Sequence, residues 1–282
     1  MTTGMTPAGP LLVDAHVHLY DVFDAAAFLD AALANIRAAA GALGCAAGAT
    51  GCLMLAGTAR TLHPEAFARR LGGSPWRMET TAEGGSWLAR RAGGGVLVLV
   101  GGRQIATAER VEVLALGVDR PHPDGEPLAA TVARVLDGGA VAVLPWAFGK
   151  WRALPMPVMR RLVEAASPQR IFLGDNGGRP IGFPTPAPFR WAVRCGVPVL
   201  PGSDPLPLAR HGTRAGQYGF VLPGVWDAER PAAAVCRLLT GLTGQPRVFG
   251  RRIGPLAFVR DQIGLRRNAP ARLPVGAGET AP

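Results

Sequence analysis

The stretch Leu11-Leu12-Val13-Asp14-Ala15-His16-Val17-His18 decides what fold to expect for this 282-residue chain. Its apolar beginning predicts a strand that is buried on both faces, and polar residues follow where such a strand would end. Further short apolar runs of the same kind recur along the sequence. They occupy residues 51–56, 96–100, 111–117, 140–144, 170–174 and 197–200.

Segments with helical periodicity separate most of these runs. Asp24 can cap a helix over residues 25–43, in which apolar residues recur at every third or fourth position, and Gly44 can end it. Other helices are expected at 64–71, 128–136, 157–166, 188–195 and 231–242. Helical crossovers imply parallel strands, so we expect an α/β protein that forms a TIM-like, distorted β/α barrel of about seven strands. An open doubly wound sheet is the alternative.

Two segments lie outside this alternation. Residues 77–80 and 87–90 flank Glu83-Gly84-Gly85, which predicts a β-hairpin inserted into the barrel. From residue 268 onward the sequence is rich in proline and glycine and has no periodicity. We therefore expect one barrel domain over residues 1–267 and a disordered tail over residues 268–282.

Composition narrows the class of protein. Hydrophobic residues make up 48% of the chain and charged residues 18%, which is too apolar for an intrinsically disordered protein. No apolar run approaches the roughly 18–20 uninterrupted residues of a membrane-spanning helix. No secretory signal is evident, and the four cysteines lack C-x-x-C spacing. We therefore expect a cytoplasmic protein with free, buried thiols and no membrane partner.

The formal net charge is +10, and arginine supplies nearly all of the positive charge because Lys150 is the only lysine. Such an excess is compatible with a small anionic substrate or with nucleic acid. The basic residues are scattered except over Arg247–Arg272. Nucleic-acid binding is therefore the weaker of the two expectations.

Candidate metal ligands follow the first expected strand. His16 and His18 are two residues apart and therefore project from the same face of a strand. Two adjacent imidazoles suit a divalent ion such as Zn, Mn or Fe, although a packed, hydrogen-bonded histidine pair gives the same pattern. Asp204 follows the run at 197–200 and could bind the metal, act as general base, or cap a helix. Asp175, after the preceding run, could complete the site.

Polar side chains also follow other expected strands. Two tryptophans flank the lysine in the loop after 140–144, and an Asp-Asn-Gly-Gly-Arg segment follows 170–174. These groups could bind a substrate or stabilise negative charge, although tight turns favour the same residue types. His63 and His122 are expected at the surface. The expected catalytic residues are Asp204, Asp175, Lys150 and Arg179, and the expected substrate-binding residues are Arg103, Asn176, Trp146, Trp151 and His211.

Four short motifs, spread over residues 11–207, resemble one family. Residues 14–18 (Asp-Ala-His-Val-His) and Gly202-Ser203-Asp204 look like the first and last motifs of the polymerase-and-histidinol-phosphatase (PHP) family, and the wider amidohydrolase superfamily begins and ends similarly. Residues 112–117 and 138–145 resemble two PHP strands. The resemblance implies a distorted seven-stranded barrel with a cluster of two or three metals. Many PHP members hydrolyse phosphoesters, and others are nucleases or proofreading domains.

The sequence departs from the PHP pattern wherever that family carries further ligands. His16, His18 and Asp204 carry over, which implies one mononuclear site in place of a cluster. The positions where the family carries its other metal ligands are occupied here by residues that are not the expected ligands. These positions are Gly57-Thr58-Ala59, Gly102-Arg103-Gln104, Leu144 and Pro205-Leu206.

Three functions remain open at this point. The first is a metal-dependent hydrolase of PHP type that acts on an anionic substrate, such as a phosphoester, through a single divalent ion. The second is a catalytically degenerate barrel, without a required metal, that binds a ligand or a protein. The third is a nucleic-acid-associated protein. The sequence lacks a Gly-x-Ser-x-Gly motif and a base next to any cysteine, which argues against serine and cysteine hydrolases.

Overall fold

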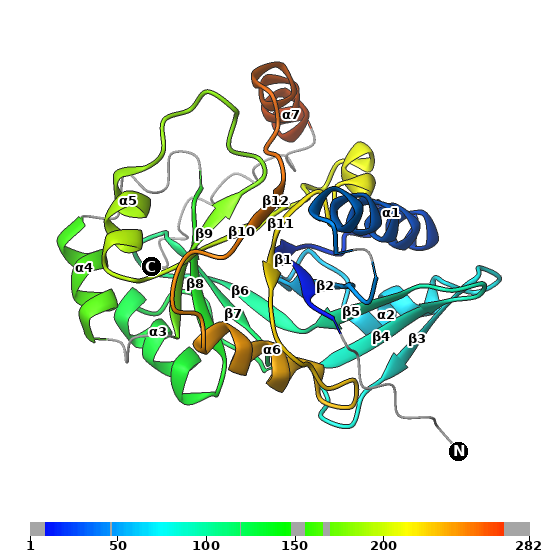
Figure 1. The fold of residues 1–282 in the computed structure, drawn as a ribbon. Coiled ribbons are helices and arrows are strands. Elements are labelled where there is room, and N and C mark those ends of the chain that lie inside the picture. Colours follow the sequence, from blue (N-terminus) through cyan, green and yellow to red (C-terminus); the bar gives the residue numbers. More distant parts are fainter. Residues whose placement is uncertain (1–8, 46, 119, 148–155, 166–169, 268–282) are drawn as a thin grey trace, which may run out of the picture.

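The computed structural model describes residues 9–45, 47–118, 120–147, 156–165 and 170–267, which form two mixed sheets covered by helices (Figure 1). One sheet has the order β12-β11-β1-β2-β5-β4-β3, and the other has the order β10-β9-β8-β7-β6. The strands of the first are β1 (Leu11–Val17), β2 (Thr50–Leu55), β3 (Trp76–Thr80), β4 (Ser86–Arg91), β5 (Val96–Val100), β11 (Tyr218–Leu222) and β12 (Val248–Gly250). Those of the second are β6 (Gly102–Ala106), β7 (Glu112–Leu116), β8 (Val141–Pro145), β9 (Ile171–Asn176) and β10 (Val199–Gly202).

The expected TIM-like barrel is wrong. Among the described residues neither sheet closes on itself, and antiparallel pairs occur in both sheets, including β4 with β5 and β6 with β7. Short loops join these pairs, whereas a parallel crossover needs about a dozen residues or more. Even β7 and β8, which are separated by a helix, pair antiparallel. The alternative, an open doubly wound sheet, is right in that both described sheets are open, but their antiparallel pairs do not fit a doubly wound parallel sheet.

The helices expected from the sequence are confirmed, with ends that differ by two residues or fewer. The first begins at Asp24, whose side chain accepts a hydrogen bond from the Ala27 amide at 2.8 Å, and it ends at Gly44 with φ +72°. These helices are α1 (Ala25–Leu43), α2 (Pro64–Arg69), α3 (Leu128–Asp137), α4 (Met156–Ala165), α5 (Ala187–Arg194) and α6 (Pro231–Thr240).

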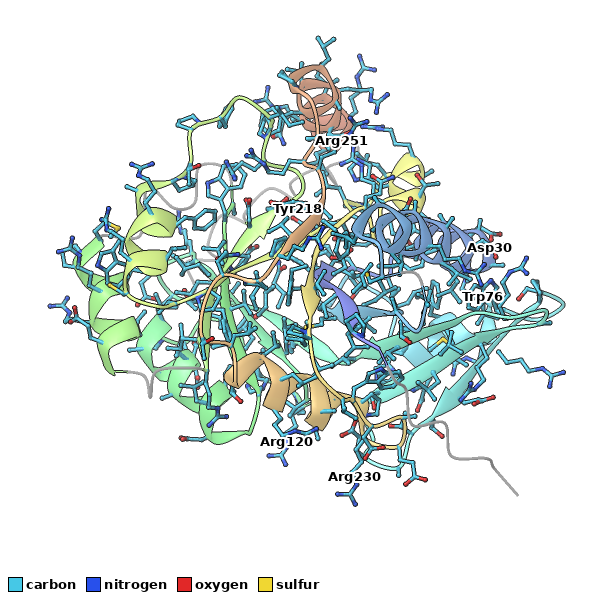
Figure 2. The ribbon with its side chains drawn as sticks, in the orientation of Figure 1. Asp30, Trp76, Arg120, Tyr218, Arg230 and Arg251 are labelled. Carbon is cyan, nitrogen blue, oxygen red and sulfur yellow. The ribbon has the colours of Figure 1, made fainter. Side chains whose placement is uncertain are left out.

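The expected hairpin is confirmed as β3 and β4, which pair antiparallel. Trp76 on β3 donates its indole N–H to the carboxylate of Asp30 on α1 at 3.0 Å, and Arg91 on β4 donates to the same carboxylate at 2.8 Å. Figure 2 shows Asp30 and Trp76 side by side at this edge of the molecule. The hairpin therefore extends the sheet and is fastened to α1.

Several elements were not expected from the sequence: β6, β11, β12, a 3-10 turn over Ala209–Thr213 and helix α7 (Pro255–Arg267). The strands are short and lack a continuous apolar run. In α7 the apolar side chains are largely exposed, Leu256 to 88%, so a buried stripe does not mark the helix in the sequence. The expected tail at 268–282 lies outside the described residues.

Strand β1 is buried on both faces, as its sequence predicts. Leu11 and Val13 pack into one apolar cluster, and Leu12 and Val17 pack into another together with α1. By length and hydropathy, α1 could cross a membrane, but Asp30 and Arg37 interrupt it and its buried residues pack on the sheet. This packing accounts for the apolar character of α1.

The four cysteines are free thiols, as expected. Only Cys52 is fully buried; Cys195 is exposed, and the other two are partly buried. The expectation of buried thiols therefore holds for one of the four.

Candidate metal centre

His16 and His18 converge with Asp204 in a partly enclosed pocket. The alternation of side chains along a strand sends both imidazoles to the same side of the end of β1. Their Nε2 atoms lie 3.0 Å apart, and they lie 3.6 Å and 3.4 Å from Oδ1 of Asp204. The three residues form a possible metal-binding triad, as their sequence positions predict.

These spacings suit a single ion. Nitrogen and oxygen ligands about 2.0–2.2 Å from a tetrahedral ion lie about 3.3–3.6 Å from one another. The two His–Asp distances fall in this range, and the His16–His18 distance is slightly shorter. The His18 ring packs between His16 and Tyr20, with ring centroids 4.9 Å and 5.4 Å away, which fixes its orientation.

A buried carboxylate, Asp14, joins the elements that carry the triad. It accepts backbone N–H bonds from Ser203 and Gly216 at 2.8 Å each and from His16 at 3.3 Å. Burial raises the pKa of Asp14 to about 6, and these hydrogen bonds act in the opposite direction. The Asp204 amide in turn donates to the His16 carbonyl at 2.8 Å. The end of β1 and the segment after β10 are therefore held in a fixed relative position.

Asp204 has an uncommon backbone conformation, with φ at +47°. Aspartate tolerates the left-handed region better than most residues, but non-glycine residues rarely occupy it. Such strain is concentrated at functional sites, where the surrounding structure holds it in place. In this chain the conformation directs the carboxylate toward the two histidines.

Amide side chains surround the triad. Gln104 on β6 lies with its Oε1 atom 3.2 Å from Nε2 of His16, and it donates to Oε1 of Glu112 at 2.9 Å. Asn176, the last residue of β9, donates to Oδ2 of Asp204. The triad is thus linked through hydrogen bonds to one further carboxylate, that of Glu112.

The electrostatics of the pocket favour a cation. Burial lowers the pKa of His16, with Asp204 acting in the opposite direction, so the ring is neutral near pH 7. Burial opposes ionisation of Asp204, but the two histidines and the Asn176 amide outweigh it and hold the pKa of Asp204 well below its usual range. The ionised Asp204 carboxylate places a negative charge beside the two imidazoles, which a divalent ion would neutralise.

The triad lines a cavity of about 290 Å³. Helix α7 borders it through Phe258, Asp261 and Gln262. Asp261 anchors this helix, because it accepts from Arg210 at 2.8 Å and from Arg214 at 2.7 Å. No arginine or lysine of the described part of the chain lines this cavity.

Two of the expected catalytic residues face a different cavity. Arg179 donates two hydrogen bonds of 2.7 Å to Asp175, and the Tyr218 hydroxyl donates a third at 2.7 Å. All three side chains line a cavity beside α5. Because neighbouring residues of a strand alternate, Asn176 faces the triad and Asp175 faces away from it. The structure therefore does not bring Asp175 and Arg179 to the candidate metal centre.

The other expected site residues divide into three groups. Asn176 and Trp146 line the cavity of the triad. Arg103 lines a separate cavity, described below. His211 is fully buried, accepts from the Leu206 amide at 2.9 Å and lies 3.1 Å from Asp261, so it positions α7. Lys150 and Trp151 lie outside the described residues.

The two remaining histidines behave differently from each other. His63 is exposed at the start of α2, as expected, and its Nδ1 accepts from the Glu65 amide at 3.4 Å. The expectation for His122 is wrong, because only 6% of it is exposed. Its proline-rich loop suggested a surface position, but the loop folds over Arg103, which donates to the His122 carbonyl at 3.1 Å.

Gln104, Glu112 and Asp261 belong to the pocket and were not identified from the sequence. A signal existed for Glu112, which is the second residue of the strand expected over 111–117. Gln104 stands where the PHP family carries a carboxylate ligand, and the sequence did not indicate that it contacts His16. The sequence gives no sign that Asp261 is near the site, because no buried apolar stripe marks the helix α7 that carries it.

No protein-family model matches the sequence, and no curated protein matches it significantly. Among solved structures, the chain is similar to the crystal structure of PsfC from Pseudomonas syringae PB-5123. The two share 15% sequence identity, with 92% of this chain and 98% of that chain covered and a TM-score of 0.47. A likeness this distant carries no argument about function, and the PHP resemblance stays a prediction.

Proposed function

We propose that this chain is a metal-dependent hydrolase that holds one divalent ion at His16, His18 and Asp204. The observation that carries the proposal is the convergence of two imidazole nitrogens and one carboxylate oxygen within 3.0–3.6 Å of one another. The group carries the negative charge of Asp204, and no lysine or arginine of the described chain lines its cavity, so a bound cation would supply a counter-charge. Three protein ligands beside a pocket leave a coordination position open toward the cavity, as catalytic sites require.

A bound ion would supply Lewis acidity and a water nucleophile at neutral pH. The chain contributes the remaining groups. Asn176 fixes the Asp204 carboxylate through its second oxygen. Gln104 lies between His16 and Glu112, which places the Glu112 carboxylate one side chain away from the triad. We assign to Glu112 the role of proton acceptor, since Asp175 faces another cavity.

The substrate follows from the same pocket. Its volume of about 290 Å³ admits a small molecule. The ion itself would attract an anionic oxygen, such as that of a phosphoester, while the described lining contributes acidic and amide groups. We therefore propose an anionic substrate because the ion is positively charged, and not because arginine side chains line the pocket.

The test uses the full chain, stripped of metal and reloaded separately with Zn, Mn and Fe(II). Activity is measured on a panel of phosphoesters and cyclic amides. We expect hydrolysis with a redox-inert ion such as Zn, which distinguishes a hydrolase from the Fe(II) oxygenases that use a similar donor set. Metal-loaded protein that hydrolyses nothing in the panel would favour a degenerate binding protein.

Two variants separate the roles of the residues. Asp204→Asn should lose both metal and activity. Glu112→Gln should keep the metal and lose activity by about 10²–10⁴-fold, the usual contribution of a general base. Glu79→Gln, an exposed carboxylate on β3, is the matched control and should change neither. Unchanged activity in Glu112→Gln would remove Glu112 from the mechanism.

A further inference from the structure

A second cavity, of about 310 Å³, lies on the opposite side of β1 and β6 from the metal centre. It has no lining residue in common with the cavity of the triad. Strand alternation explains the separation. Val17 faces this cavity while His16 and His18 face the other, and Arg103 faces it while Gln104 contacts His16.

One wall of this second cavity is apolar and aromatic. Leu19, Leu55 and Trp87 line it, and only 5% of Trp87 is exposed. The imidazole of His63 stands edge-on to the indole, with centroids 6.0 Å apart and an angle of 89° between the planes. An edge-to-face pair of this kind forms a rigid corner against which a flat ring can pack.

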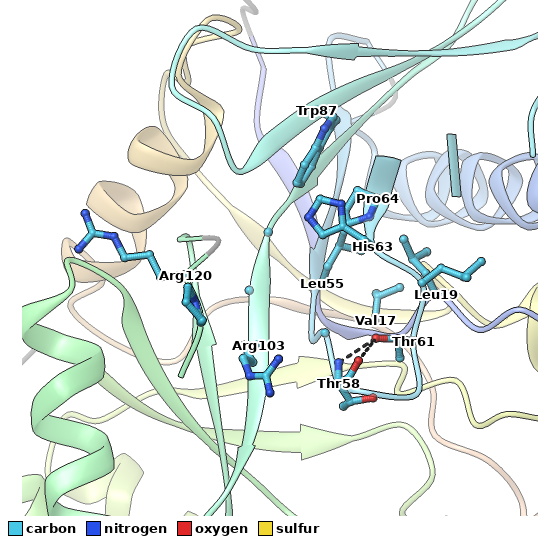
Figure 3. A pocket seen from close by; sticks show the side chains of 15 residues that line it. Val17, Leu19, Leu55, Thr58, Thr61, His63, Pro64, Trp87, Arg103 and Arg120 are labelled. Atoms are coloured by element: carbon cyan, nitrogen blue, oxygen red, sulfur yellow. Dashed lines mark hydrogen bonds between the residues drawn. The ribbon is translucent and has the colours of Figure 1, made fainter. Parts of the chain in front are cut away.

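The other wall is cationic. In Figure 3, Arg103 lies across the cavity from Trp87 and His63, and Arg120 lies at the edge of the cavity with its guanidinium group turned outward. The Nε atom of Arg103 donates to the His122 carbonyl, which fixes the guanidinium group, and its Nη atoms have no hydrogen-bond partner within the described residues. Arg120 is exposed at the rim. No aspartate or glutamate of the described chain lines the cavity.

The pKa of the nearby His122 is shifted by the same positive charges. Burial lowers the pKa of His122, and the charges of Arg103 and Arg120 act in the same direction. A fixed guanidinium with open donors in a half-enclosed, largely apolar cavity is the usual arrangement for binding a carboxylate or phosphate on a hydrophobic body.

We propose that this cavity binds a small molecule with an aromatic ring and a single anionic group. The ring packs against Trp87 and Leu55, and the anion takes the hydrogen bonds of Arg103, with Arg120 adding positive charge at the rim. The cavity volume lies at the lower end of the range for ligand sites, about 300–1,000 Å³, which limits the ligand to one or two rings. The site does not depend on the metal centre or on the hydrolase activity.

Isothermal titration calorimetry of the full chain tests this proposal. The probes are phenylacetate, indole-3-acetate and phenyl phosphate, and neutral phenylacetamide is the control ligand. At least one anionic probe should bind with one-to-one stoichiometry, and phenylacetamide should bind at least about tenfold more weakly, because it lacks the negative charge that strengthens a hydrogen bond from Arg103.

Variants then locate the site. Arg103→Gln should weaken binding at least about tenfold, Arg103→Lys less, and the exposed Arg120→Gln by about threefold. Arg77→Gln, an exposed arginine on β3, is the matched control and should leave binding unchanged. Circular dichroism confirms that each variant is folded, and Arg120 carries the test if Arg103 variants are not.

Three results would overturn the proposal. One is the failure of all three anionic probes to bind, and another is equal binding of phenylacetamide. The third is binding that Arg103→Gln and Arg120→Gln leave intact but His16→Ala/His18→Ala abolishes, which would place the anion at the metal centre.

Discussion

Asp175 lies near the end of β9 and Asp204 lies just after the neighbouring strand β10, and both are largely buried, but the groups that surround them differ. The Asp175 side chain, 9% exposed, receives two hydrogen bonds from Arg179 and one from Tyr218. The Asp204 side chain, 14% exposed, faces two histidines and an amide, and no guanidinium of the described residues. A carboxylate that is paired with a guanidinium already has its counter-charge, whereas one that faces imidazole nitrogens is suited to bind a metal cation together with them.

Removing the counter-charge from Asp175 gives the largest expected effect on stability. Arg179→Ala leaves a buried, unpaired carboxylate and should lower the free energy of unfolding by about 3–5 kcal/mol, measured by denaturant titration. Arg190→Ala, an exposed arginine beside the same cavity, should change it by less than about 0.5 kcal/mol. Asp204→Asn in metal-free protein loses the contacts of an ionised carboxylate but leaves no buried charge unpaired, and asparagine tolerates the same positive φ, so the loss should be smaller than in Arg179→Ala. Equal losses in Arg179→Ala and Asp204→Asn would contradict the comparison.

Asp14 is a third buried carboxylate, and it accepts hydrogen bonds from backbone N–H groups instead of from an arginine or a histidine. Asp14→Asn replaces one accepting oxygen with an amide that faces a backbone donor, which should cost about 1–3 kcal/mol of unfolding free energy. Asp24→Asn is the matched control, because asparagine caps a helix as well as aspartate does. Thermal unfolding of both variants measures the difference, and equal melting temperatures would show that the three N–H bonds to Asp14 contribute little.

Buried and exposed histidines should differ in the same way, because burial without a partner disfavours the charged form. Burial keeps the folded-state pKa of His122 below 6.5, and its ring nitrogens have no hydrogen-bond partner within the described residues. Below pH 6.5 the unfolded chain therefore binds the proton first, and stability should fall by up to about 1.4 kcal/mol per pH unit until the folded-state pKa is reached. His122→Leu should reduce this slope in unfolding measured between pH 7 and pH 5, and exposed His63→Gln should not. An unchanged slope in His122→Leu would mean that His122 titrates normally.

The smallest effect is expected at the surface. Glu79 pairs with Arg90 at 2.7 Å, but the two side chains are 52% and 36% exposed. Glu79→Gln should change the free energy of unfolding by less than about 0.5 kcal/mol, because solvent screens the pair. If Glu79→Gln lowered the free energy of unfolding as much as Arg179→Ala does, burial would not explain the difference between the Glu79–Arg90 pair and the Asp175–Arg179 pair.

The sequence predicts the helices and the buried strands well because their signals are local. The alternation at His16 and His18 and the cap at Asp24 depend only on residues close in the chain, and both are confirmed. Strand direction is not local. Seven apolar runs look alike whether they pair parallel or antiparallel, and the short loops before β5 and β7 decide the direction.

The site could be predicted only in part for a related reason. Asp204 was identified because it follows a recognisable strand. Asp175 and Asn176 occupy equivalent positions in the sequence, and the strand register alone decides which of the two faces the triad. Asp261 comes from a helix whose exposed apolar side chains give no signal of burial.

The central claim is that the negative charge at Asp204 is neutralised by a bound ion. The direct measurement is metal content of the purified full chain by mass spectrometry, before and after incubation with Zn or Mn. We predict close to one ion per chain in the wild type and in Asp175→Asn, and almost none in His16→Ala/His18→Ala. A wild-type protein without metal after incubation, or an equal metal content in the double variant, would contradict the claim.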